Sequence, residues 1–170
     1  MNKKIYIGIC ATVILVLVIL FVYIFSPKLS QNEEDLLYSK IESIMLESEQ
    51  EQLNNYKVFL SMKRFGYDKE KDNTYIYCWI QTESFFVNEE GRVEMYEGSS
   101  MPYKFTFKGE EYIGYEVPKD GRDYQESINE LFPFSVRSKF DNIYEDDYLK
   151  NEIIKQVESY YNINIEDIYY

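Results

Sequence analysis

The sequence contains no histidine. This absence excludes Ser-His and Cys-His nucleophile pairs and any zinc site that uses a histidine ligand. It also removes the side chain that most often transfers protons near neutral pH. We therefore expect a protein that is not an enzyme and that uses neither a metal ion nor a cofactor.

Cysteine and glycine are also scarce, with two and seven residues respectively. Cys10 lies in an apolar run and Cys78 is the only cysteine outside it, so no disulfide can form within the remaining chain. The glycines form neither a dinucleotide-binding fingerprint nor a phosphate-binding loop. Stability must therefore come from a hydrophobic core, and nucleotide binding has no support.

Basic side chains are outnumbered, with 18 lysines and arginines against 30 acids and a net charge of −12. A chain with this charge is repelled by phosphate backbones, so we expect no nucleic-acid partner. The charge favours cations or basic partners. A solvated acidic surface without any partner is the simpler explanation.

The chain does contain one long apolar run, residues 5–25, without a charged side chain. A helix of that length covers roughly 31 Å, enough to cross a bilayer. Tyr6 and Tyr23 lie near its ends, as aromatic residues do at membrane boundaries, and Pro27 ends the helix. We predict a transmembrane helix within residues 1–27, with the lipid bilayer as its partner through residues 5–25.

The alternative for this run is a cleaved signal peptide. The run exceeds the roughly 7–15 apolar residues of a signal core, and no cleavage site with small residues follows it. Lys3 and Lys4 precede the run, whereas residues 33–35 are acidic. The positive-inside rule then predicts a retained anchor with a cytoplasmic N-terminus, and a C-terminal domain outside the cell membrane.

After a linker at residues 28–32, the pattern predicts one extracytoplasmic domain over residues 33–161 and a tail at 162–170. Apolar residues at helical spacing, including Leu37, Ile41 and Met45, predict an amphipathic helix over residues 33–53. The period then changes to two, which predicts antiparallel strands at residues 56–65, 74–87, 92–97, 103–107 and 111–117. Helical patterns follow at residues 123–131, 134–140 and 145–161. The expected fold is α+β: a helix packed on a five-stranded antiparallel sheet, followed by two or three C-terminal helices.

The second predicted strand has two apolar faces. Ile76, Cys78 and Ile80 share one face, and Tyr75, Tyr77 and Trp79 share the other. Because a sheet covered on one side only has a polar second face, this aromatic row must be covered by something. The cover is either the C-terminal part of this chain or an external partner, and Tyr75, Tyr77 and Trp79 are therefore our candidate binding residues.

Two segments carry a resemblance to a known family: GSSMPYKFTF at residues 98–107 and VPKDGRDYQESINELFP at residues 117–133. Their Gly-Ser bend, Thr-Phe strand, Pro-x-Asp-Gly turn and Phe-Pro helix end resemble an uncharacterised extracytoplasmic domain of Gram-positive bacteria. The similarity covers about residues 33–140. That domain also occurs at the outer end of membrane metallopeptidases of the beta-lactam-sensor type. Because the peptidase part is absent here, the resemblance implies a sensory or accessory role only.

These observations lead to one functional hypothesis and one alternative. We expect a single-pass bacterial membrane protein whose outer domain performs non-catalytic binding, sensing or assembly with a membrane or cell-surface protein partner. The alternative is a carboxylate-dependent hydrolase that acts on cell-wall polymer, since a pair of acids at suitable spacing is easily found among 30. The sequence does not select which pair.

Overall fold

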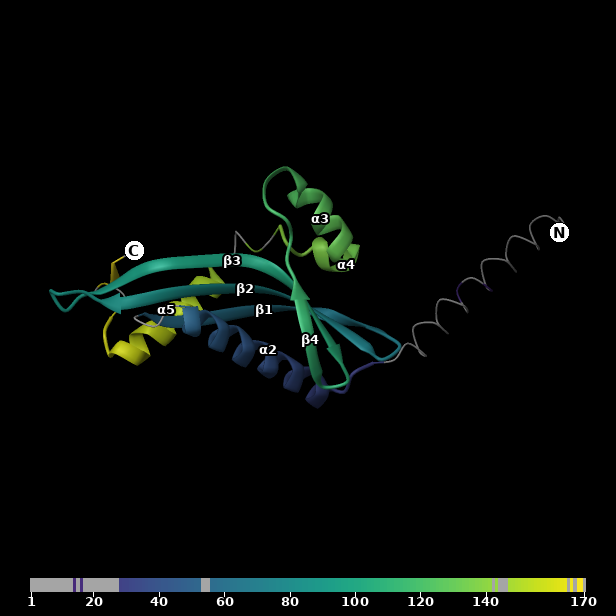
Figure 1. Ribbon diagram of the computed structural model, residues 1–170, viewed down its shortest axis with the longest axis horizontal. Coiled ribbons are helices and arrows are strands. Elements are labelled where there is room, and N and C mark those ends of the chain that lie inside the picture. The colour runs from purple at the N-terminus through teal and green to yellow at the C-terminus, as the bar shows by residue number, and fades with distance from the viewer. Residues whose placement is uncertain are drawn as a thin grey trace, which may run out of the picture.

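The computed structural model describes residues 14, 16, 28–52, 56–141, 143, 147–164, 166 and 168–169. Helix α2 (Gln31–Gln52) precedes strands β1 (Lys57–Glu70), β2 (Asn73–Val87), β3 (Val93–Lys108) and β4 (Glu111–Glu116). The short helix η1 (Gly121–Asp123), helices α3 (Tyr124–Leu131), α4 (Phe134–Arg137) and α5 (Tyr148–Tyr161), and strand β5 (Ile168–Tyr169) complete the order (Figure 1). The fold class is α+β.

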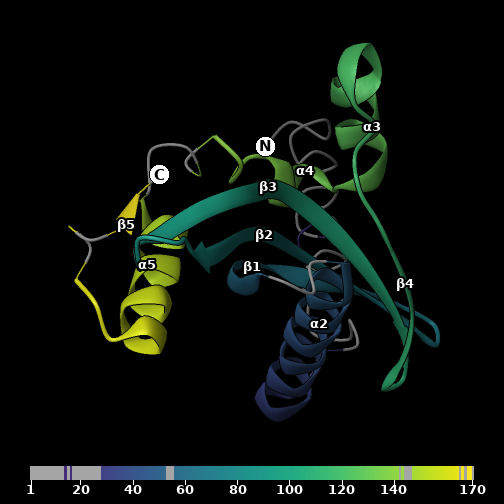
Figure 2. The same ribbon diagram turned by 60° about the vertical axis from the view of Figure 1, so that its left-hand side comes forward.

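The sheet is an antiparallel meander in the order β1-β2-β3-β4. Strand β5 pairs in parallel with the start of β3, where Val93 lies opposite Ile168. The long strands β1, β2 and β3 curve together, as Figure 2 shows most clearly for β3. Among the strands that the structure describes, none pairs with the outer side of β1, which therefore forms an edge of the sheet.

Helix α2 covers one face of the sheet. It begins with a capping box, in which the Glu33 carboxylate accepts hydrogen bonds from the Ser30 N–H (2.8 Å) and hydroxyl (2.7 Å). These bonds lower the pKa of Glu33. The buried contacts join Leu37, Tyr38, Ile41 and Met45 of α2 to Leu60, Ile76, Cys78, Ile80, Tyr103, Phe105 and Phe107 of the sheet.

Helices α3, α4 and α5 cover the opposite face through two clusters. One joins Phe65, Tyr77 and Trp79 to Ile128, Phe132, Val136, Phe140, Ile143 and Leu149. The other joins Phe59, Phe85 and Val93 to Ile153, Val157 and Ile168. The sheet is therefore buried on both faces, which explains why neither face of β2 is polar.

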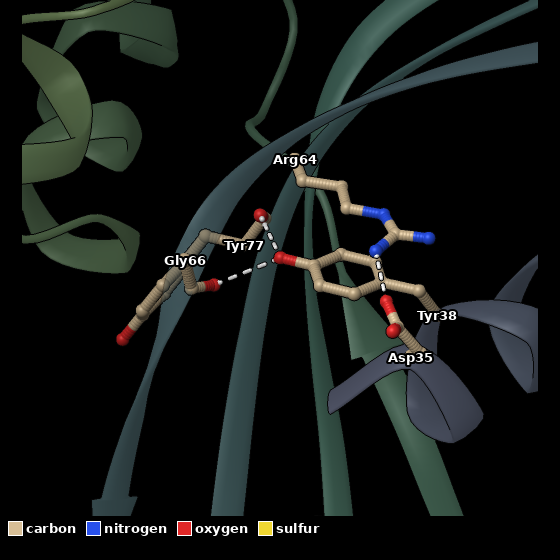
Figure 3. A network of polar contacts seen from close by, with 5 residues as sticks. All are labelled: Asp35, Tyr38, Arg64, Gly66 and Tyr77. Carbon is tan, nitrogen blue, oxygen red and sulfur yellow. Dashed lines mark hydrogen bonds and ion pairs between the residues drawn. The ribbon is translucent and has the colours of Figure 1, made fainter. Parts of the chain in front are cut away.

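A polar network fastens α2 to a bulge in β1 (Figure 3). The Tyr38 hydroxyl donates towards the carbonyls of Gly66 and Tyr77, at 3.3 and 3.4 Å, and burial raises its pKa. Arg64 lies 4.4 Å from the Tyr38 ring centroid and pairs with Asp35 at 2.6 Å. Gly66 has φ +115°, a conformation that other residues rarely adopt, so it permits the bulge.

The predicted five-stranded antiparallel sheet is wrong, because the third and fourth predicted strands are one strand. Residues 98–102 were expected to bend, yet Gly98 pairs with Glu83 and Pro102 with Trp79 within β3. The irregularity is a single-residue bulge at Tyr96, and Pro102 lies beyond the part of β3 that pairs with β4, at an open edge where proline is tolerated. Within the described residues, four strands pair antiparallel, and the two-residue β5 pairs in parallel.

The predicted architecture also included a transmembrane helix, and this requires correction. Among the described residues, no helix is both long enough and apolar enough to cross a membrane. Of the run at residues 5–25, the structure describes only residues 14 and 16, so the remainder of that prediction lies outside the described residues. The expected position of the domain outside the cell membrane stays a prediction.

Candidate functional site

The aromatic row of β2 is covered by the protein itself. Trp79 is 1% exposed and Tyr77 is 4% exposed, beneath the cluster formed with α3 and α4. The Trp79 indole N–H donates to the Ser100 hydroxyl at 2.8 Å. Only Tyr75 is partly exposed, with the Lys104 ammonium 4.9 Å from its ring centroid. Of the two covers that we expected for the aromatic row, the structure shows the C-terminal part of this chain over Tyr77 and Trp79, so these two candidate binding residues belong to the core, and of the three candidates only Tyr75 remains partly accessible.

A large hollow lies elsewhere, along the open edge of β1, and measures about 970 Å³. We call it the edge groove. In Figure 2, β1 runs between α2 and α5, the two helices that form its walls. Its lining is Leu46, Glu47, Gln50 and Glu51 of α2, Lys57, Val58 and Phe59 of β1, and Glu152, Lys155, Gln156, Ser159 and Tyr160 of α5.

Along this groove, side-chain amides form hydrogen bonds with backbone groups at the outer edge of β1 and of Tyr56 just before it. The Gln50 amide donates to the Tyr56 carbonyl at 2.7 Å and accepts from the Val58 N–H at 3.2 Å. The Gln156 amide donates to the Leu60 carbonyl at 2.8 Å. Unpaired strand edges are sites of unwanted pairing, and these glutamines satisfy part of this edge without a neighbouring strand.

The two walls of the edge groove differ in charge. On the α5 side, Lys155 pairs with Glu152 at 2.5 Å, and the Lys57 ammonium lies 5.3 Å from the Tyr160 ring centroid. On the α2 side, Glu47 and Glu51 form no ion pair with a described residue. Within the described part of the chain, the α2 wall therefore presents two carboxylates without an ion-pair partner to whatever enters the groove.

A smaller hollow, of about 220 Å³, is lined by several acids and is the place to look for the carboxylate pair of a hydrolase. Glu49, Glu83 and Glu97 line it. Burial raises the pKa of Glu49, assisted by the charge of Glu97, and burial also raises the pKa of Glu83. This hollow is smaller than the roughly 300–1,000 Å³ of ordinary ligand pockets. No group of acids or cysteines among the described residues is arranged to hold a metal ion.

Glu83 allows a test of whether burial in this hollow raises the pKa of a carboxyl group. Its Oε1 atom accepts a hydrogen bond from Gln81 at 2.7 Å, whereas Oε2 is buried without a partner among the described residues. Because burial raises the folded-state pKa of Glu83, the folded protein binds this proton more tightly than the unfolded chain, and the contribution of Glu83 to stability falls as pH rises above about 4. We expect Glu83→Gln to raise the free energy of unfolding at neutral pH but not below about pH 4.

Urea denaturation of the two proteins at several pH values measures this difference. Glu89→Gln, at an exposed position, is the matched control and should change little. A Glu83→Gln protein that is less stable than wild type at neutral pH would mean that the carboxylate has a favourable partner.

Comparison with known proteins gives no relative. No family model matches the sequence, and neither a curated protein nor a solved structure matches it. The resemblance to an extracytoplasmic domain therefore stays a prediction. The site rests on the geometry of this chain alone.

The residues of the edge groove were not identified from the sequence. One signal was present, because the first strand of a meander normally lies at the edge of its sheet. The positions of Gln50 and Gln156 gave no signal, since they depend on how α2 and α5 pack on opposite sides of β1. Surface glutamines on helices are common, and their spacing carries no information about a distant strand.

Proposed function

We propose that this protein is a non-catalytic binding domain that holds a partner polypeptide in the edge groove, in a sensing or assembly role. The observation that carries this proposal is the combination of a large hollow and an open strand edge at the same place. Ligand sites are usually concave and partly apolar. The walls offer apolar surface at the partly exposed Leu46 and the exposed Tyr160 beside charged rims, whereas the side chains of Val58 and Phe59 in the floor are buried.

The edge groove is a better candidate site than the aromatic row of β2 or the small hollow lined by acids, for two reasons. The aromatic row of β2 is buried, so it offers no comparable surface. The hollow around Glu49, Glu83 and Glu97 is smaller than ordinary ligand pockets, so we do not extend the proposal to a hydrolase.

Site-specific photo-crosslinking in cells that make the protein natively tests the proposal. A photoreactive phenylalanine at Glu51, on the groove rim, should crosslink a partner, whereas one at the exposed Lys71, in the β1–β2 turn, should not. Ser159→Trp places a large ring on the α5 wall and should abolish the crosslink because it fills the groove.

Asn151→Trp is the matched control, since Asn151 is exposed on the same helix but does not line the groove. This variant should retain the crosslink from Glu51. The proposal fails if Ser159→Trp crosslinks as well as Asn151→Trp while both remain folded by circular dichroism. Equal crosslinking from Lys71 would also exclude the groove as the specific site.

A further inference from the structure

We infer that the partner enters the edge groove as an extended segment that adds to β1 in parallel, displaces the Gln50 and Gln156 amides, and directs alternate basic side chains to the α2 wall. This inference rests on the proposed function and names the partner's chemistry and its mode of binding. Addition of a strand to an open sheet edge is a recurrent mode of peptide recognition.

The Gln50 amide marks the direction of the added strand. In parallel pairing, a residue of the new strand donates its N–H to the carbonyl before the facing residue and accepts from the N–H after it. The Gln50 amide makes both bonds, to the Tyr56 carbonyl and the Val58 N–H, on either side of Lys57. It therefore occupies the place of the N–H and the carbonyl of one strand residue opposite Lys57. In a hydrogen-bonded antiparallel pair, the added strand would instead bond the N–H and the carbonyl of the same β1 residue.

The same edge continues towards Leu60. Backbone groups of alternate strand residues point to the same side, so the Val58 carbonyl and the Leu60 N–H lie on this edge with the atoms that the glutamines bond. No side chain of the described residues bonds either of these two groups. Beyond them, the Gln156 amide holds the Leu60 carbonyl. An added segment would bond the vacant groups and replace both amides.

The charges on the two walls of the edge groove predict which side chains the added segment carries. Residues opposite Lys57 and Phe59 would point to the α5 side, where Tyr160 lies 5.7 Å from the Phe59 ring, and would be apolar. Residues opposite Val58 and Leu60 would point to the α2 wall, where Glu47 and Glu51 lack ionic partners among the described residues. Lysine or arginine at these positions supplies the missing charge. The occupant is therefore a segment that alternates apolar and basic residues.

The test measures binding of short, capped peptides to the full chain by fluorescence anisotropy. A peptide alternating valine with lysine should bind at least about tenfold more tightly than one alternating valine with glutamate, and than one with its lysines grouped at one end. Replacing both Glu47 and Glu51 with lysine should reverse the preference between lysine and glutamate peptides. Gln50→Ala should tighten binding, because the competing amide is gone.

N-methylation distinguishes strand addition from other contacts. Methylating the alternate peptide amides that face β1 should abolish binding, and methylating the other set should leave it unchanged. If both sets bind equally and Ser159→Trp still blocks them, strand addition is wrong while the groove remains the site. If the valine–lysine peptide binds neither wild type nor Gln50→Ala, the inference fails, and the crosslink from Glu51 tests the proposed function independently. Binding that persists in Ser159→Trp also overturns the inference.

Discussion

Replacing Trp79 with alanine is expected to lower the free energy of unfolding by about 3–5 kcal/mol, the usual cost of removing a large buried aromatic side chain. Trp79 is 1% exposed, and its ring meets Phe140 edge to face at a centroid distance of 5.4 Å. Its indole N–H also bonds the Ser100 hydroxyl. Alanine therefore leaves a cavity between β2 and the α3–α4 segment and removes the hydrogen-bond donor to Ser100.

Denaturant unfolding followed by far-ultraviolet circular dichroism measures this cost, because Trp79 is the only tryptophan and its fluorescence disappears with the substitution. Two variants isolate the cause. Trp79→Phe keeps a ring beside Phe140 and should cost less than alanine. Tyr75→Ala, on the same strand face but partly exposed, should cost less as well. Equal losses for Tyr75→Ala and Trp79→Ala would contradict the burial of Trp79.

The result also separates two roles for the aromatic row. If the row were a binding surface, removing one ring would lower the affinity for a partner and leave the stability of the fold unchanged. If the row belongs to the core, removing one ring lowers the stability of the fold. Since Tyr77 and Trp79 lie beneath the chain's own helices, we expect loss of stability. The sequence already contained this alternative, because a strand with two apolar faces requires two covers.

Much of the local structure followed from periodicity. The alternation at residues 74–87 predicted β2 almost to its ends, and the apolar spacing of Leu149, Ile153 and Val157 predicted the buried stripe of α5. The pattern of α5 is strong because one repeating face packs on one surface, and that of β2 is strong because both of its faces are buried. The start of α2 was placed slightly late, since the capping box of Ser30 and Glu33 was not recognised.

The errors in the predicted strands arose at glycine and proline residues, which usually mark turns but are held in a strand here by pairing with a neighbouring strand. Gly98 and Pro102 are typical of a turn, yet both lie in β3 and pair with β2. A side chain at position 98 would meet the Glu83 side chain at 3.1 Å, so glycine there allows close packing across the pair. Strand β5 is two residues long, too short for a periodic signal.

The groove was beyond sequence reasoning for a different reason. It depends on two helices, α2 and α5, that are far apart in the chain and pack on opposite faces of one sheet. Their shared boundary at the edge of β1 is a tertiary property. No local pattern around Gln50 or Gln156 encodes it, and only the packed fold brings both amides to the same strand.

Helix α5 should depend strongly on one anchor, Ile153. The side chain is fully buried in the cluster with Phe59, Phe85 and Val157, so Ile153→Ala should lower the free energy of unfolding by about 2–5 kcal/mol. The matched substitution Asn151→Ala changes an exposed position on the same helix and should stay within about 0.5 kcal/mol of wild type. Urea denaturation provides both values.

The part of the protein that opens first in Ile153→Ala shows whether the substitution detaches α5 alone or destabilises the whole domain. Because α5 carries Gln156, whose amide bonds the Leu60 carbonyl, a loosened α5 removes one wall of the edge groove and one bond to the open strand. Hydrogen exchange in Ile153→Ala should therefore accelerate first in α5, while β2 and β3, which pair along their lengths, keep their protection under native conditions. Uniform acceleration across the sheet and α5 would mean that α5 does not open separately, and the groove wall would then be as stable as the core it covers.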